Sequence, residues 1–124
     1  MPHFTVRMRE ADLDGTVEPK LIQGLADAVG AVYGDFLRSV AVVEIFGVPE
    51  GRWGVGGKPA TSPAPVVNLN LRAAALEIEG AAERLIAEIT DAVAAAVGEE
   101  ARSGVTVGLT AVPPGRSGTG GAVD

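Results

Sequence analysis

The stretch Val48-Pro49-Glu50-Gly51-Arg52-Trp53-Gly54-Val55-Gly56-Gly57 returns, with changes, as Val112-Pro113-Pro114-Gly115-Arg116-Ser117-Gly118-Thr119-Gly120-Gly121. Arg52 and Arg116 occupy the same place in the two copies, an offset of 64 residues (116 − 52 = 64). Three shorter matches upstream keep this offset: Leu21-Ile22 with Leu85-Ile86, Asp27-Ala28-Val29 with Asp91-Ala92-Val93, and Arg38-Ser39 with Arg102-Ser103. The chain is therefore one supersecondary unit used twice.

Composition narrows the class of protein. With 124 residues and 47% hydrophobic content, the sequence predicts a single globular domain over 1–124, with repeat units at 1–60 and 64–124. The net charge of −6 argues against a nucleic-acid or anionic-membrane partner. There is no cysteine, and His3 is the one histidine, so disulfides and a cysteine- or histidine-cluster metal site are excluded. The charged N-terminal stretch lacks a signal-peptide core and no apolar run reaches membrane length, so we expect a cytoplasmic protein.

The first unit reads as strand, helix, strand and hairpin. Residues 3–9 alternate apolar and polar side chains, which is typical of a half-buried strand. Asp14 or Thr16 can cap a helix whose apolar stripe ends near Gly34. A β-branched stretch from Val40 to Phe46 predicts the second strand, the glycine-rich segment predicts a hairpin, and residues 58–63 predict a short polar link.

The second unit repeats this order, with one change of register. At an offset of 64, the apolar positions of the first strand would face Asn68, Asn70 and Arg72, turning the strand inside out. An offset of 63 restores the faces and also aligns Pro2 with Pro65. We therefore expect a one-residue insertion before the second helix.

These elements predict an α+β fold. A helix between two strands of one sheet implies a right-handed crossover and parallel pairing, so each unit is a β-α-β unit. Two tandem β-α-β units give a four-stranded mixed sheet with two helices on one face. The other face carries Arg7, Asn68 and Asn70 beside apolar side chains, and we expect other subunits to cover it.

A chain that opens Met-Pro and carries Gly51-Arg52-Trp53-Gly54-Val55-Gly56-Gly57 after its second strand resembles the tautomerase superfamily, of the 4-oxalocrotonate tautomerase type. With two fused copies of the unit, the chain is similar in length to the malonate semialdehyde decarboxylases and chloroacrylate dehalogenases of that superfamily. The resemblance implies a tautomerase-like fold, no cofactor, a small anionic carboxylate substrate and, because each fused chain replaces two short subunits, a homotrimer.

The same resemblance implies a catalytic role for Pro2, whose nitrogen becomes a free amine once Met1 is removed. An α-amine titrates at about 7.7–8.0, and an apolar pocket with nearby arginines disfavours its protonated form, which suits proton transfer near neutral pH. Pro65 has an amide nitrogen without basicity, and Ser117 stands where the first hairpin has Trp53. One working site per chain follows, with Trp53 either lining it or capping the core.

Arginines would hold the substrate carboxylate by bidentate hydrogen bonds. Arg72 ends the first strand of the second unit, where the decarboxylase and dehalogenase groups also have arginines, and Asn70 lies beside it on the strand. Arg9 ends the equivalent strand of the first unit, a position that arginine also takes in a dehalogenase subunit. Arg38 is a further candidate, for which a solvated surface or inter-subunit position is favoured. The short tautomerases have an arginine where this chain has Ala41, a departure that weakens a strict oxalocrotonate-type assignment.

A carboxylate beside the proline would separate the possible reactions. Asp35 resembles the decarboxylase aspartate in spacing, although Asp is common at helix ends, and Glu44 lies in an apolar strand; either could activate water. Three functions stay open at this point: a tautomerase or isomerase of enol or 2-keto acids, a decarboxylase or hydratase/dehalogenase on the same fold, and a non-catalytic trimeric binding module.

Overall fold

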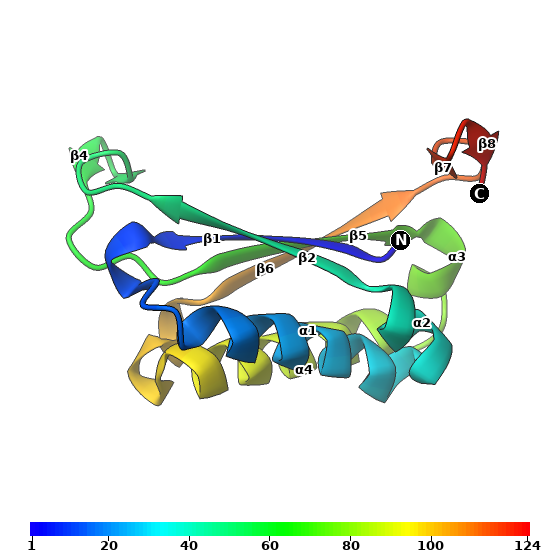
Figure 1. Ribbon diagram of the computed structural model, residues 1–124, viewed down its shortest axis with the longest axis horizontal. Helices are drawn as coiled ribbons and strands as arrows, with labels where there is room; N and C mark the ends of the chain where they lie inside the picture. Colours follow the sequence, from blue (N-terminus) through cyan, green and yellow to red (C-terminus); the bar gives the residue numbers. More distant parts are fainter.

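The computed structural model describes residues 1–124 and contains one four-stranded sheet with both long helices on the same face (Figure 1). The strands are β1 (His3–Arg9), β2 (Val42–Val48), β5 (Val66–Arg72) and β6 (Thr106–Val112), in the order β2-β1-β5-β6. β1 and β5 pair antiparallel at the centre, and each pairs parallel with the outer strand of its own unit. The predicted mixed sheet of two tandem β-α-β units is confirmed.

The helical layer consists of α1 (Val17–Tyr33) and α4 (Ala81–Val97). Two short helices, α2 (Asp35–Val40) and α3 (Ala73–Leu76), and two 3-10 turns, η1 (Glu10–Asp12) and η2 (Glu99–Gly104), connect the layers. Gly34 ends α1 with a φ of 97°, as expected for a helix-terminating glycine. The prediction that the second strand starts at Val40 was wrong, because this residue closes α2 and the strand begins at Val42.

The two repeat units are related by an offset that changes once along the chain. β1 and β5 are related by 63 residues, whereas α1 and α4, β2 and β6, and the two hairpins are related by 64. The extra residue lies between β5 and α4, since residues 73–80 replace residues 10–16. The predicted insertion before the second helix is confirmed.

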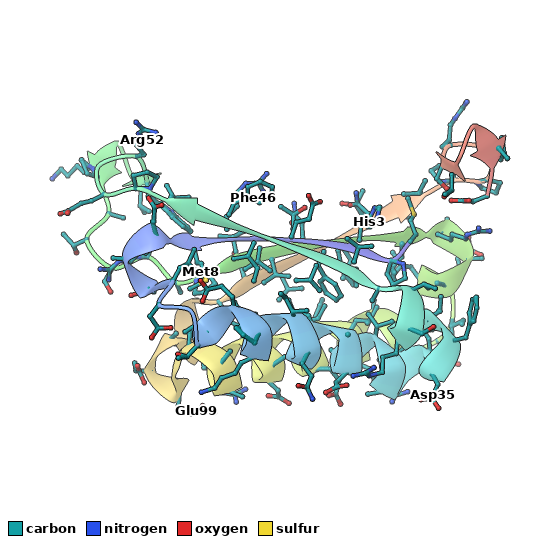
Figure 2. The ribbon with its side chains drawn as sticks, viewed as in Figure 1. His3, Met8, Asp35, Phe46, Arg52 and Glu99 are labelled. Atoms are coloured by element: carbon teal, nitrogen blue, oxygen red, sulfur yellow. The ribbon has the colours of Figure 1, made fainter.

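The core lies between the sheet and the helices. Alternate residues of the central strands are fully buried, and one stripe of each helix packs against them; the members include Phe4, Val6, Met8, Val67, Leu69, Leu71, Leu21, Leu25, Val29, Leu85, Ile89 and Val93. Figure 2 shows Met8 on this inner side of β1, and His3 and Phe46 on the open side of the sheet. Each large apolar side chain buried here stabilises the fold by about 1.5–3 kcal/mol. No helix has both the length and the apolar character needed to cross a membrane.

Each glycine-rich segment forms a hairpin at a corner of the molecule (Figure 1). In the first, β3 (Gly54–Val55) pairs with β4 (Lys58–Pro59), and Gly56 and Gly57 form the turn with φ values of 61° and 83°. Two successive positive φ values define the tight turn that favours glycine at both positions. The second hairpin, β7 (Gly118–Thr119) and β8 (Ala122–Val123), is built the same way. The predicted link over 58–63 was too long, because its first two residues belong to β4.

Candidate functional site

Pro2 lies just before β1, at the end of the sheet where β5 finishes. Its side chain is fully buried, and its carbonyl oxygen accepts a hydrogen bond of 3.0 Å from the backbone N–H of Val42. His3 pairs with Asn70, so extending the antiparallel register by one residue aligns Pro2 with Leu71, the neighbour of Arg72. The chain start and α3, which follows Arg72, lie side by side in Figure 1. The structure therefore brings Pro2, Asn70 and Arg72 to one end of the sheet.

The second hairpin stands over this end of the sheet. Arg72, Pro113 and Ser117 are among the residues that line a cavity of about 150 Å³ there. Arg72 and Asn70 are both exposed on the open face, because they alternate with the buried residues of β5. Arg72 thus faces a small cavity at the sheet end where Pro2 lies, whereas Pro2 and Asn70 are not among the residues that line this cavity.

Arg9 and Trp53 lie at the opposite end of the sheet. Seven residues of extended strand separate Arg9 from Pro2, which corresponds to roughly 23 Å at about 3.3 Å per residue. Arg9 and Trp53 line a separate cavity of about 100 Å³ beneath the first hairpin. Within one chain, the structure does not bring these two predicted substrate-binding residues to Pro2.

Arg38 takes part in an ion pair of the helical layer. Its Nε lies 2.6 Å from Oδ1 of Asp27 in α1. The second unit repeats the contact, with Nη1 of Arg102 2.6 Å from Oδ1 of Asp91. A signal for this was present in the sequence, because these same residues keep the 64-residue offset.

The two predicted acids lie away from Pro2. Glu44 is on the open face of β2 and pairs with Thr5, two residues further along the sheet than the pair of Val42 with His3. Asp35 is exposed in the first turn of α2, and Figure 2 shows it at the outer corner of the helical layer. Neither carboxylate lies next to Pro2 in the same chain.

Known proteins match this chain in structure but not in sequence. No family model matches, and no curated protein matches. A fused 4-OT described as an asymmetric trimer is 24% identical with a TM-score of 0.86, covering 98% of this chain and 95% of its own. A fused 4-OT described as a symmetric trimer is 20% identical, TM-score 0.84, covering 99% of this chain and 95% of its own. N1, a member of the cis-3-chloroacrylic acid dehalogenase family, is 17% identical, TM-score 0.84, covering 98% of this chain and 82% of its own.

The chain has the same fold as these fused 4-OT and cis-3-chloroacrylic acid dehalogenase-family proteins. The expected resemblance is thereby confirmed at the level of fold, over nearly the whole chain. What these neighbours catalyse is a property of those proteins, and at such low identities the likeness carries the architecture alone.

The sequence pattern gave no indication of one further residue near this end of the sheet. The hydroxyl of Tyr33, at the end of α1, donates a hydrogen bond of 2.8 Å to the carbonyl oxygen of Ala75 in α3. Burial raises the pKa of Tyr33 above its usual value. Because α3 starts directly after Arg72, this bond fixes the segment that carries the arginine. Periodicity could not find it, since the second unit has Val97 at the equivalent position.

Proposed function

We propose that this chain is a cofactor-independent tautomerase or isomerase of small enol or 2-keto carboxylic acids. Pro2 is its general acid and base once Met1 has been removed. The observation that carries the proposal is the position of the proline: it immediately precedes the central strand β1, at the sheet end where Arg72 finishes β5. Proton transfer needs a group that titrates near neutral pH, and a terminal proline nitrogen meets this need.

Each of the three residues at this end has a role that follows from its chemistry. The Pro2 side chain is fully buried, and burial disfavours the protonated amine, so the nitrogen is available as a base. The Arg72 guanidinium binds the substrate carboxylate through paired hydrogen bonds. Asn70 donates a hydrogen bond to the oxygen on which charge develops as the proton leaves carbon.

We further propose that the working form is a homotrimer. The open sheet face exposes Val42 and Phe46 at 41% and 49% of their surface, next to Arg7. Apolar side chains on a continuous sheet face are covered in most stable proteins. Fused 4-OT structures with the same fold are described as trimers, which supports the same assembly here.

A paired substitution tests the proposal. The ketonisation of phenylenolpyruvate, followed by ultraviolet absorbance, is compared between the wild type, Pro2→Ala and Pro65→Ala. We expect Pro2→Ala to lower kcat/KM about 10²- to 10⁴-fold, the usual contribution of general acid–base catalysis. Pro65 is also a buried proline, but its nitrogen is an amide, so Pro65→Ala leaves the rate within about threefold. Equal rates for the wild type and Pro2→Ala would leave only the non-catalytic binding module.

Intact mass and two further substrates complete the test. Mass spectrometry of the purified protein should give the chain without Met1, because a retained methionine blocks the nitrogen. Malonate semialdehyde and 3-chloroacrylate report on the alternative decarboxylase or hydratase/dehalogenase reaction. We expect slow turnover of both, because Glu44 and Asp35, the two acids predicted to activate water, lie away from Pro2.

A further inference from the structure

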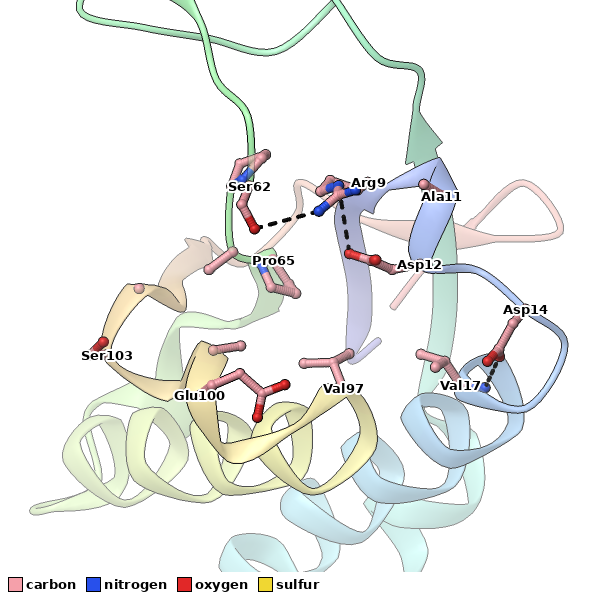
Figure 3. Close-up of a pocket in the computed structure, with 14 residues that line it drawn as sticks. Arg9, Ala11, Asp12, Asp14, Val17, Ser62, Pro65, Val97, Glu100 and Ser103 are labelled. Atoms are coloured by element: carbon pink, nitrogen blue, oxygen red, sulfur yellow. Dashed lines mark hydrogen bonds and ion pairs between the residues drawn. The ribbon is translucent and has the colours of Figure 1, made fainter.

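A cleft of about 680 Å³ lies at the Pro65 end of the sheet, and the proposed function makes no use of it (Figure 3). Its walls come from the end of β1, the start of α1, the last turn of α4 with η2, and the segment before β5. Volumes of this order are typical of small-molecule sites. The cleft is the counterpart, in the second unit, of the space around Pro2.

The cleft is open because the second unit has smaller side chains there. In the first unit, Tyr33 and Leu37 pack against the core at the Pro2 end. The residues 64 positions later are Val97 and Ala101, and both line the cleft. Two large side chains have thus become small ones in one copy, and the space they would fill is accessible to a ligand.

Two opposite charges face this space from different walls. Nη1 of Arg9 lies 3.4 Å from Oγ of Ser62, and Nε of Arg9 lies 3.9 Å from Oδ2 of Asp12. Because these are the only polar contacts of its side chain, most of its five N–H groups are free to bind an anion. Figure 3 shows Glu100 across the cleft from Arg9, and its carboxylate has neither a hydrogen bond nor an ion pair. Val97 lies beside Glu100, so the wall next to that carboxylate is apolar.

A third carboxylate at the rim is already occupied. Asp14 accepts hydrogen bonds from the Thr16 backbone N–H at 2.9 Å, the Thr16 hydroxyl at 2.7 Å and the Val17 N–H at 3.1 Å, and so caps α1. Glu100 is therefore the carboxylate free to bind a cation. Together the three acids outnumber Arg9 and give the cleft a negative balance that disfavours simple anions.

We propose that this cleft is a second binding site, for small molecules that carry both an ammonium group and a carboxylate. The carboxylate binds Arg9, the ammonium binds Glu100, and the aliphatic part lies along Val97 and Pro65. At the Pro2 end, Arg72 lines a cavity of about 150 Å³, much smaller than this cleft, so the two sites differ in the size of ligand they accept. The site is independent of catalysis, since Pro65 has no basic nitrogen.

The test uses the intact, isotope-labelled protein and three probes of equal length: 4-aminobutyrate, butyrate and n-butylamine. Backbone amide shifts near Glu100 and Ser103 are followed by NMR at constant ionic strength. We expect 4-aminobutyrate to give saturable shifts there, with an affinity about tenfold or more above that of either single-charge probe. Glu100→Gln should weaken 4-aminobutyrate binding by about tenfold, whereas Glu79→Gln, an exposed acid at the other end of the helical layer, should not.

Binding is measured directly, so the outcome does not depend on whether the chain is a tautomerase. Equal affinities for the three probes would overturn the proposal, as would undiminished binding of 4-aminobutyrate by Glu100→Gln. Shifts that fail to saturate, or that centre on Arg72 instead of Glu100, would overturn it as well. An unchanged circular dichroism spectrum of Glu100→Gln serves as the check that this variant is folded.

Discussion

Alanine substitution of the two strand-end arginines should have very different effects on catalysis. Arg72 ends β5 next to the residue that aligns with Pro2, whereas Arg9 is roughly 23 Å along β1 from Pro2. Charge-assisted hydrogen bonds contribute about 1.5–3 kcal/mol, and Arg72 is exposed, so water competes for it and the lower part of this range applies. About 1.5–2 kcal/mol corresponds to a loss of roughly 10- to 30-fold in kcat/KM.

The assay is phenylenolpyruvate ketonisation over a range of substrate concentrations, with circular dichroism to verify folding. Arg72→Ala should raise KM and lower kcat/KM by this factor, while Arg9→Ala stays within about twofold of the wild type. Arg52→Ala, an exposed hairpin arginine, is the matched control. If Arg9→Ala costs as much as Arg72→Ala, Arg9 of a neighbouring subunit reaches Pro2, and the assignment of the site to one end of one chain is refuted.

Three further predictions concern stability, measured by urea denaturation. Ile89→Ala should lower the free energy of unfolding by about 2–5 kcal/mol because Ile89 is fully buried, whereas Ile86→Ala, at a 43% exposed position, should change it by less than about 0.5 kcal/mol. Tyr33→Phe should cost about 1 kcal/mol, the usual value of one hydrogen bond. Because burial raises the pKa of Tyr33, its folded form keeps the proton longer, so the wild type should lose stability as pH rises above about 10 and Tyr33→Phe should lose less. Hydrogen bonds from the Thr16 side chain, and then from the Thr16 and Val17 backbone N–H groups, lower the pKa of Asp14. The stabilisation of the fold by ionised Asp14 is therefore present above the ordinary pKa of a carboxyl group and is lost as the pH falls through the lowered pKa. Asp14→Asn should not show this loss of stability in acid.

Most of the fold could be predicted from the sequence because the same pattern of strand, helix, strand and hairpin occurs twice in the chain. The alternation in 3–9 and 66–72 assigned the buried faces of both central strands, and their parity located the extra residue between β5 and α4. The double glycine at 56–57 fixed the hairpin, since two successive positive φ values favour glycine. Val40 was misassigned because a β-branched residue in the last turn of a short helix has the same local appearance as the start of a strand.

The periodicity of the sequence could not predict which site residues lie at the same end of the sheet. A pattern shows which face of a strand a residue occupies, but the antiparallel pairing of β1 with β5 decides which ends meet. That pairing sets Pro2 near Arg72 and leaves Arg9 near Trp53, although the sequence alone suggested all four for one site. The Tyr33 hydrogen bond and the cleft near Glu100 arise where the two copies differ, so the repeat itself gave no sign of them.

The near two-fold relation between the sheet ends has a consequence for circular permutation. The Pro65 carbonyl accepts a hydrogen bond from Thr106 at 3.3 Å, the counterpart of the bond from Val42 to Pro2. Both termini lie at the same end of the molecule, so a short linker can join them while the backbone is opened before Pro65 (Figure 1). Such a rearranged chain would exchange the chemical states of the two proline nitrogens, and the same architecture would present its free secondary amine at the sheet end near Trp53 instead of the end near Ser117.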